Sequence, residues 1–340
     1  MSWQHVVLTE FGGPEVLRVE AREALPEPGP GEVRVKVLAA GTGFTDTLIR
    51  AGQYPGIGTK PPFVPGYEWF GVVDAVGPGV ENLSVGQHVA DMSVIGGYTQ
   101  VLVAPADEVI AAPDGLNPTR AVAMMLSYST AYQMLTRLRA LTRGASVLIH
   151  AAGGATGTAL LDCARALGLT AYATGSPAKH EMIRRYGGIP IDYRSEDFVA
   201  RIAAETDGRG VDAVFDPIGG RHFDRSRQCL TGNGLLVIYG AMHLTSGEES
   251  VPRFLWGLVK HLGLKRVFGD GREASFFHID KRRQKHPDAF RQDVQDLFAM
   301  LARGEIDPAI AAVEPLDQAA DVHRRIEDGD VAGKIVLDCR

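Results

Sequence analysis

The sequence has few cysteines: Cys163, Cys229 and Cys339 are the only three among 340 residues. Their number is odd, they lie far apart, and no Cys-x-x-Cys pair occurs. This pattern excludes a disulfide framework and indicates free thiols in a reducing cytoplasm. No apolar run approaches the ~20 residues that a membrane-spanning helix needs. The first residues, MSWQHVVLTEF, lack the basic and apolar regions of a signal peptide. We therefore expect a cytoplasmic protein without membrane insertion.

An excess of positive charge is also missing. The 35 Lys and Arg residues are outnumbered by 41 Asp and Glu residues, for a net charge of −6. The short run Lys281-Arg282-Arg283 is typical of a solvated loop or helix face, so we expect no nucleic-acid partner. No Gly-x-Ser-x-Gly segment or similar arrangement supports nucleophilic catalysis. The length predicts two domains, since one domain has about 100–200 residues.

Residues 144–168 combine a strand, a glycine-rich turn and a helix, and read GASVLIHAAGGATGTALLDCARALG. Small residues in such a turn let the backbone approach a pyrophosphate, which the N–H groups and dipole of the following helix stabilise. Because the turn has a strand before it and a helix after it, we predict dinucleotide binding. Gly154 and Gly157 fit the second and third glycines of the fingerprint, and Ala152 replaces the first. The residues expected to bind the cofactor here are Ala152, Gly154, Ala155, Thr156 and Gly157.

The order of the expected elements indicates two different domains. Short strands separated by glycine and proline turns, with one helix at Thr45–Ala51, occupy the first part. After Asn117-Pro118, helices alternate with strands, which is typical of a parallel, doubly wound sheet. We predict an α/β protein in which residues 1–122 and 272–340 form a β-rich domain and residues 123–271 a Rossmann-type nucleotide-binding domain. The ligand is expected at the carboxyl ends of the parallel strands.

The end of the second strand of the nucleotide domain distinguishes NADH from NADPH. An acidic residue there binds the ribose 2′-hydroxyl, whereas its absence beside basic groups admits the 2′-phosphate. The strand Thr170–Thr174 runs into Gly175-Ser176-Pro177-Ala178-Lys179, with no acid at the turn. Ser176 is expected to cap the following helix, whose end can bind a phosphate together with Lys179. A capped helix with an exposed lysine is the alternative, but it leaves the missing acid unexplained. We therefore predict NADPH, with Gly175, Ser176, Lys179 and Tyr193 near its adenosine end; a half-buried strand-end tyrosine is the other interpretation of Tyr193.

Two segments of the first part resemble motifs that carry zinc in the medium-chain dehydrogenase/reductase superfamily. They read Gly41-Thr42-Gly43-Phe44-Thr45-Asp46 and Gly66-Tyr67-Glu68. The β-rich part, the Ala-x-x-Gly-x-x-Gly turn and the returning tail are similar to that superfamily over essentially the whole chain. Its zinc enzymes have a cysteine before the Thr-Asp pair, a histidine between glycine and glutamate, and a lobe with four cysteines. Here these ligands are missing and Tyr67 replaces the histidine, so we expect no metal.

The resemblance narrows to the zinc-independent quinone oxidoreductase branch, which includes the zeta-crystallins. It rests on His150–Gly168 and Ile191–Arg194. Three further segments are similar to the synaptic-vesicle membrane protein homologues within that branch, namely Ser176–Tyr193, Asp216–Gly220 and Tyr239–Met242. The resemblance implies a GroES-like catalytic domain, a Rossmann domain and metal-free reduction of quinones or activated alkenes by NADPH.

This chain departs from the branch at two positions. Many quinone oxidoreductases have asparagine and tyrosine where this sequence has Gly43 and Leu48. The loss of these two polar groups suits a larger or more apolar substrate. It also keeps open a second hypothesis, an NADPH-binding protein with little turnover that binds an apolar ligand or a partner.

Hydride transfer without zinc needs hydrogen-bond donors for the developing enolate or quinol oxygen. Tyr67, at the former ligand position, is the first candidate donor, with a role as pocket wall as the alternative. The resemblance places Thr130 near the nicotinamide, although such a hydroxyl can also bond its own helix backbone. Asp46 is a candidate proton source; an ion pair with Arg50, four residues later on the same helix, is the alternative.

The remaining predictions concern the nicotinamide end and the assembly. The resemblance implies that Phe277 lies over the nicotinamide, where its backbone holds the carboxamide. Gly240 and Ala241 follow a sheet strand and are expected to face the cofactor. The family implies a homodimer formed by edge-to-edge pairing of the last strands of the nucleotide domain. The edge strand expected here is Lys265–Phe268.

Overall fold

The computed structural model describes residues 2–54, 57–245, 247–264, 270–329 and 331–340. The chain divides into two compact units, one formed by Met1–Ser129 with Arg291–Arg340 and the other by Thr130–Phe290. The first unit is therefore built from two separate stretches of sequence. In the part of the chain that the structure describes, no helix is both long enough and apolar enough to cross a membrane.

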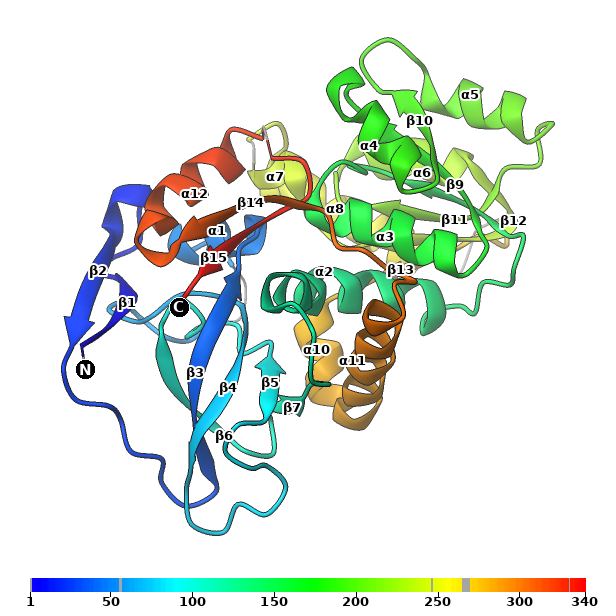
Figure 1. Ribbon diagram of the computed structural model, residues 1–340. Helices are drawn as coiled ribbons and strands as arrows, with labels where there is room; N and C mark the ends of the chain where they lie inside the picture. Colours follow the sequence, from blue (N-terminus) through cyan, green and yellow to red (C-terminus); the bar gives the residue numbers. More distant parts are fainter. Residues whose placement is uncertain (1, 55–56, 246, 265–269, 330) are drawn as a thin grey trace. The chain divides into compact units, whose positions relative to one another are not determined.

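The first unit is β-rich. Its larger sheet has the strand order β14-β15-β3-β4-β5-β7, with β6 paired to β3, and β1 pairs with β2 in a separate ribbon (Figure 1). The strands are β1 (Trp3–Leu8), β2 (Leu17–Arg22), β3 (Glu32–Gly41), β4 (Glu68–Val76), β5 (His88–Asp91), β6 (Val101–Pro105), β7 (Ile110–Ala111), β14 (Ile310–Pro315) and β15 (Lys334–Asp338). The helices are α1 (Phe44–Arg50), α11 (Pro287–Ala302, which begins in the second unit) and α12 (Ala319–Glu327). Because β15 pairs with β3, the C-terminal tail completes this sheet.

The second unit contains one parallel sheet of order β10-β9-β8-β11-β12-β13. In chain order this is 3-2-1-4-5-6, the arrangement of a doubly wound dinucleotide-binding fold. The strands are β8 (Ser146–Ile149), β9 (Thr170–Gly175), β10 (Gly188–Asp192), β11 (Val211–Asp216), β12 (Leu230–Ile238) and β13 (Glu273–Phe276). The helices are α2 (Pro118–Thr136), which begins in the first unit, α3 (Ala155–Ala166), α4 (His180–Arg185), α5 (Phe198–Glu205), α6 (Arg221–Gln228), α7 (Met242–Thr245), α8 (Val251–Leu258) and α10 (Ile279–Lys285) (Figure 1). The predicted α/β class, with a β-rich part and a Rossmann-type sheet, is confirmed.

Apolar strands hold this sheet in place. Val147, Leu148 and Ile149 of β8 are all fully buried, as are Val214 and Phe215 of β11. A parallel sheet covered by helices on both faces needs such continuous apolar runs rather than alternation. The two central strands therefore form a rigid base for the loops at their carboxyl ends.

The sixth strand differs from its prediction. The segment Lys265–Phe268, expected to be the edge strand, lies outside the described residues, and β13 at Glu273–Phe276 takes the edge position beside β12. Four residues that include Glu273 and Ser275 give too weak a β signal to identify from sequence. The boundaries also differ from residues 122 and 272. Helix α2 continues across the first boundary, and β13 keeps the segment after residue 272 in the second unit.

Candidate functional site

The parallel sheet brings most of the expected nucleotide-binding residues to one edge. Asp192 at the end of β10 lies opposite Gly175 of β9, and Ile238 of β12 lies opposite both Asp216 of β11 and Phe276 of β13. The segments that follow these strands therefore lie along the carboxyl edge of the sheet. They contain Ala152–Gly157, Gly175–Lys179, Tyr193, Gly240–Ala241 and Phe277. Thr130, in contrast, is buried on α2.

The glycine loop after β8 is tightly folded against the start of α3. Ala152 N–H donates to the Thr174 carbonyl (3.0 Å), and Gly154 N–H donates to the Ala151 carbonyl (3.1 Å). A Cβ on Gly157 would lie 2.4 Å from the Ala151 oxygen, so only glycine fits there. A Cβ on Gly154 would meet no described protein atom closer than 3.6 Å. The first N–H groups of a helix have no intrahelical acceptor, so this loop presents donors suited to an anion.

The turn after β9 carries a serine and a lysine next to the glycine loop. Ser176 precedes a short 3₁₀ helix (Pro177–Lys179), but its side chain makes no capping hydrogen bond, contrary to the expectation for an N-cap. Lys179 N–H instead donates to the Ser176 carbonyl (2.9 Å). The Lys179 side chain lies across Gly153, because a Cβ there would fall 2.2 Å from Lys179 Cδ. This glycine therefore makes room for the lysine.

The acid at the end of the neighbouring strand is engaged by its own turn. Asp192 accepts hydrogen bonds from the Ser195 hydroxyl (2.7 Å) and from Arg194 N–H (3.0 Å). The bond from Ser195, followed by that from Arg194, lowers the pKa of this carboxyl. Tyr193 is 55% exposed, with the Arg194 guanidinium 5.7 Å from its ring centre. A ring that is about half exposed agrees with both interpretations of Tyr193, a strand-end tyrosine and a contact of the adenosine end.

A buried polar network joins β8 and β11, the strands between which the chain order reverses. The Ser226 hydroxyl lies 2.5 Å from Asp216 Oδ2, 3.2 Å from His150 Nε2 and 3.3 Å from His222 Nδ1. His222 Nδ1 is 2.8 Å from the same Asp216 oxygen. Burial lowers the pKa of His150 to about 3, which keeps it neutral. Burial alone would raise the pKa of Asp216, but the hydrogen bond and charge of His222 hold it at about 2.

Two histidines and a carboxylate are also a common set of metal ligands, and their ligand atoms lie within 4.8 Å of one another. A zinc ion bonds such atoms at about 2.0–2.2 Å and would take the place of the Ser226 hydroxyl. The four side chains satisfy one another's hydrogen bonds without an ion. We therefore interpret the network as a fixed support for the strand ends. No periodic pattern in the sequence predicts this network, although Asp216 was noted in its turn.

Asp46 in the first unit holds two backbone groups rather than an arginine. It is buried, and its two oxygens accept hydrogen bonds from Tyr67 N–H (3.0 Å) and Gly43 N–H (2.9 Å). Burial, together with the charge of Glu68, raises the pKa of Asp46 to about 7. The alternative of a pair with Arg50 is wrong. Arg50 forms an ion pair with Glu327 of α12 instead, because Asp46 turns back to the start of its own helix.

Tyr67 is fully buried, and its hydroxyl lies 3.1 Å from the hydroxyl of Tyr54. The two rings meet edge to face, with centroids 6.0 Å apart and planes at 85°. Asp46 fixes the Tyr67 backbone, and β4 begins at the next residue. The sequence analysis missed Tyr54, since nothing in the local pattern connects it with Tyr67.

Glu68, beside Tyr67, forms a buried ion pair with Lys334 of β15 and also accepts a hydrogen bond from Leu126 N–H. Gly41, opposite Glu68 on β3, leaves the space for this side chain; a Cβ there would lie 2.3 Å from Glu68 Oε1. This pair was also missed. Its signal was one charged residue at the start of each of two apolar strands, GYEWFG and GKIVL.

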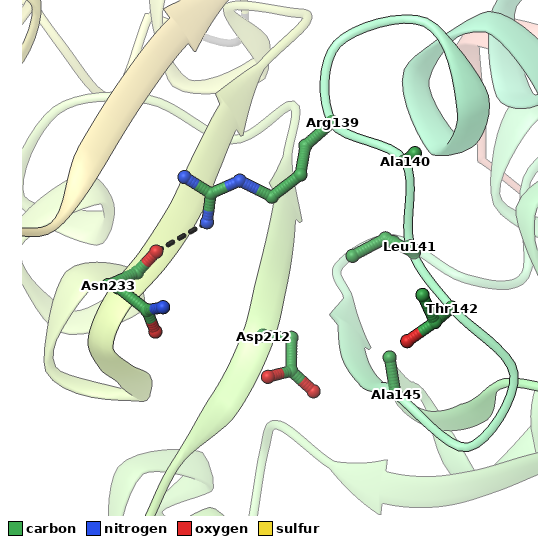
Figure 2. A pocket seen from close by; sticks show the side chains of 7 residues that line it. All are labelled: Arg139, Ala140, Leu141, Thr142, Ala145, Asp212 and Asn233. Atoms are coloured by element: carbon green, nitrogen blue, oxygen red, sulfur yellow. Dashed lines mark hydrogen bonds between the residues drawn. The ribbon is translucent and has the colours of Figure 1, made fainter.

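A hollow of about 200 Å³ lies at the other end of the parallel sheet (Figure 2). Arg139 reaches across it and donates to the Asn233 carbonyl, and Asp212 accepts from Ser146 N–H (2.8 Å). Ala145 directly precedes β8, so this hollow is at the amino ends of the strands. It is therefore separate from the nucleotide edge.

Comparison with known proteins covers nearly the whole chain. Residues 29–114 match the alcohol dehydrogenase GroES-like domain, and residues 188–337 match a family described as zinc-binding dehydrogenase. The synaptic vesicle membrane protein VAT-1 homolog of Rattus norvegicus is 32% identical over 98% of this chain and 83% of its own length. The 2-haloacrylate reductase of a Burkholderia species is 32% identical, over 97% of both chains. The crystal structure of Escherichia coli quinone oxidoreductase complexed with NADPH is similar with a TM-score of 0.84 and 28% identity, over 98% of this chain and 99% of that one.

Proposed function

The chain belongs to the medium-chain dehydrogenase/reductase superfamily, in its zinc-independent quinone oxidoreductase branch, and on this premise we propose that it reduces a quinone or an activated alkene with NADPH. NADPH supplies a hydride, which adds to an electrophilic carbon of the acceptor. The observation that carries the proposal is the carboxyl edge of the parallel sheet. There the glycine loop after β8 lies beside the turn after the neighbouring strand β9. That turn carries Lys179 and Ser176, whose side chain makes no capping hydrogen bond.

The cofactor is held by groups of the second unit. The loop Ala152–Gly157 binds the pyrophosphate, and Ser176 and Lys179 bind the 2′-phosphate, with Tyr193 against the adenosine. The second strand, β9, ends at Gly175 with no acid for a ribose hydroxyl, and Asp192 at the end of β10 accepts hydrogen bonds from Ser195 and Arg194 in its own turn. This arrangement favours NADPH over NADH.

The nicotinamide end is assigned to Thr130, Gly240, Ala241 and Phe277. Phe277 N–H already donates to the Ile238 carbonyl (2.7 Å). Its backbone therefore contributes its carbonyl, which suits the amide N–H of a carboxamide.

Tyr67 donates the proton that completes the reduction, and Asp46 positions it. Both oxygens of Asp46 accept backbone N–H groups, one of them from Tyr67 itself, so its geometry suits holding the tyrosine more than giving a proton. The motif positions of the zinc enzymes hold no thiol and no imidazole in this chain, which supports metal-free chemistry.

The test is a fluorescence titration with NADPH and NADH, followed by a panel of acceptors added to the NADPH complex. The panel contains 1,4-benzoquinone, 9,10-phenanthrenequinone, α,β-unsaturated ketones and a 2-haloacrylate. Loss of NADPH absorbance with any acceptor supports the reductase and identifies its acceptor class. Tight NADPH binding with no oxidation across the panel would refute it and favour the alternative, a binding protein for an apolar ligand or a partner.

We also propose that the protein is a homodimer that pairs through the edge of its parallel sheet. Among the described strands β13 holds this edge, and Phe276 on it is 43% exposed. An open strand edge needs a partner or protection. Light scattering that shows only monomer at micromolar concentration would contradict this.

A further inference from the structure

We propose that Tyr54 and Tyr67 form a two-hydroxyl proton relay, in which Tyr54 returns to Tyr67 the proton that Tyr67 gives to the reduced substrate. The inference rests on the proposed reductase function. It assigns a catalytic part to Tyr54, a residue that the sequence patterns did not single out.

The two hydroxyls are placed for direct proton exchange. Their oxygens are 3.1 Å apart, and either can act as the donor. Tyr67 is held at its backbone by Asp46 and at its ring by the edge-to-face contact with Tyr54. Tyr54 follows α1, which carries Leu48. The two tyrosines thus supply hydroxyls to a part of the chain where Gly43 and Leu48 bring no polar side chain.

Burial makes a relay necessary. The Tyr67 side chain is 0% exposed, whereas Tyr54 is partly exposed. A phenolate left on Tyr67 is costly in such surroundings, because burial disfavours the charged form of a tyrosine. The Tyr67 side chain is buried, and its hydroxyl is within hydrogen-bond distance of a neighbouring hydroxyl that can pass it a proton. Tyr54 is in hydrogen-bond reach of Tyr67 and has access to solvent.

The other acidic and basic groups nearby are already engaged. Both oxygens of Asp46 accept backbone N–H groups, and Glu68 is paired with Lys334 and with Leu126 N–H. These contacts hold both carboxyl groups in place. Arg50 is paired with Glu327. The Tyr54 hydroxyl lies 3.1 Å from the Tyr67 hydroxyl.

The steps balance for an enone. A bound NADPH would supply the hydride that adds to the β-carbon, and the products of that addition would be NADP⁺ and an enolate. The Tyr67 O–H bond breaks and its proton goes to the enolate, giving the saturated ketone and a phenolate. Tyr54 then gives its proton to Tyr67 and takes one from water. The sum is one NADPH, one solvent proton and one enone consumed.

The experiment compares Tyr54→Phe, Tyr67→Phe and the double variant, with Tyr172→Phe as the control. Tyr172 is in the second unit, and its hydroxyl makes only a long contact, 3.5 Å, with the Glu205 carbonyl. We would measure kcat with a saturating enone, the solvent deuterium isotope effect on kcat, the Kd for NADPH and the melting temperature. A positioned proton donor contributes about 100-fold or more.

A relay predicts that Tyr67→Phe lowers kcat by about 100-fold and Tyr54→Phe by about 10-fold or more. It also predicts that the solvent isotope effect is larger in Tyr54→Phe than in the wild type. The Kd for NADPH and the melting temperature of this variant should equal those of the wild type. Because the hydroxyls act in series, the double variant should be no slower than Tyr67→Phe. The control should match the wild type in every readout.

Three results would overturn the relay. In the first, Tyr54→Phe has the same kcat and the same solvent isotope effect as the wild type. In the second, the losses of kcat in the two single variants multiply in the double variant. Either of these refutes the relay alone and leaves the reductase function intact. The third, a wild type that binds NADPH but reduces no acceptor, refutes the reductase function and the relay together.

Discussion

Gly154 and Gly157 lie three residues apart in the nucleotide loop. Alanine variants of the two separate the effect of packing inside the protein from the effect on cofactor binding. A Cβ on Gly157 would lie 2.4 Å from the Ala151 oxygen and 2.6 Å from Ala152 Cα. Both atoms belong to the backbone, so the loop itself must move by about 1 Å to reach ordinary contact distances. Overpacking of this kind costs about 1–3 kcal/mol. Gly157→Ala should therefore destabilise the protein even without cofactor.

Gly154→Ala is the matched variant. Its methyl group would meet no described protein atom closer than 3.6 Å, which is ordinary van der Waals contact. We expect its melting temperature without cofactor to lie within about 2 °C of the wild type, whereas Gly157→Ala falls by roughly 2–12 °C. The second glycine of the fingerprint lets the backbone approach the pyrophosphate, so a methyl group at Gly154 is expected to hinder that approach. Gly154→Ala should therefore bind NADPH at least about 10-fold more weakly, a loss of about 1.4 kcal/mol.

The assay is a thermal melt without ligand together with a fluorescence titration with NADPH. If Gly154→Ala melts as low as Gly157→Ala, the packing argument fails. If Gly154→Ala binds NADPH as tightly as the wild type, the pyrophosphate does not lie on this loop. The two readouts answer separate questions, because one is taken before any cofactor is added.

Three further predictions test other parts of the site. Gly153→Ala must displace the Lys179 side chain. We therefore expect both Gly153→Ala and Lys179→Ala to raise the Kd for NADPH by about 10- to 100-fold, with little change in the Kd for NADH. An equal loss of affinity for both cofactors would contradict this. The pKa of Asp46, about 7 in the folded protein, is above its ordinary value, so the folded state keeps a proton that the unfolded chain releases. The free energy of unfolding of the wild type, measured with urea relative to that of Asp46→Asn, should then fall by up to about 4 kcal/mol as the pH rises from about 4 to 7. A difference between the two proteins that does not vary with pH would refute the assignment. Glu68→Gln strands the buried charge of Lys334 and should cost about 3–5 kcal/mol, whereas Glu68→Gln with Lys334→Met should cost clearly less; equal costs would show that the pair is not coupled.

The parallel sheet was predictable because its signal is strong and local. Apolar runs at β8 and β11 alternate with helices, and this alternation leaves few topologies once crossovers are right-handed. The glycine turn was predictable for the same reason, since its residues are contiguous. Strand β13 was not, because Glu273–Phe276 is short, polar and at the edge.

The contacts of Asp46, Tyr67 and their neighbours were harder to predict because they are long-range. Asp46 and Arg50 satisfy the rule for a helical ion pair, yet Arg50 pairs with Glu327, 277 residues away. Glu68 and Lys334 are separated by 266 residues. The resemblance to the zinc motifs identified Asp46 and Tyr67. A propensity or spacing rule considers only near neighbours, so it did not find the side chains that hold them.

The pairing of β15 with β3 has a consequence for the order in which the chain is made. Glu68 emerges from the ribosome 266 residues before its partner Lys334. Until then the first unit has an unfilled position beside β3 and a carboxylate without its cation, while the second unit, which is continuous in sequence, has everything it needs to fold. The nascent protein should therefore complete its second, nucleotide-binding unit before its first. Truncation just before Lys334 would then leave a cofactor-binding unit attached to an incomplete sheet.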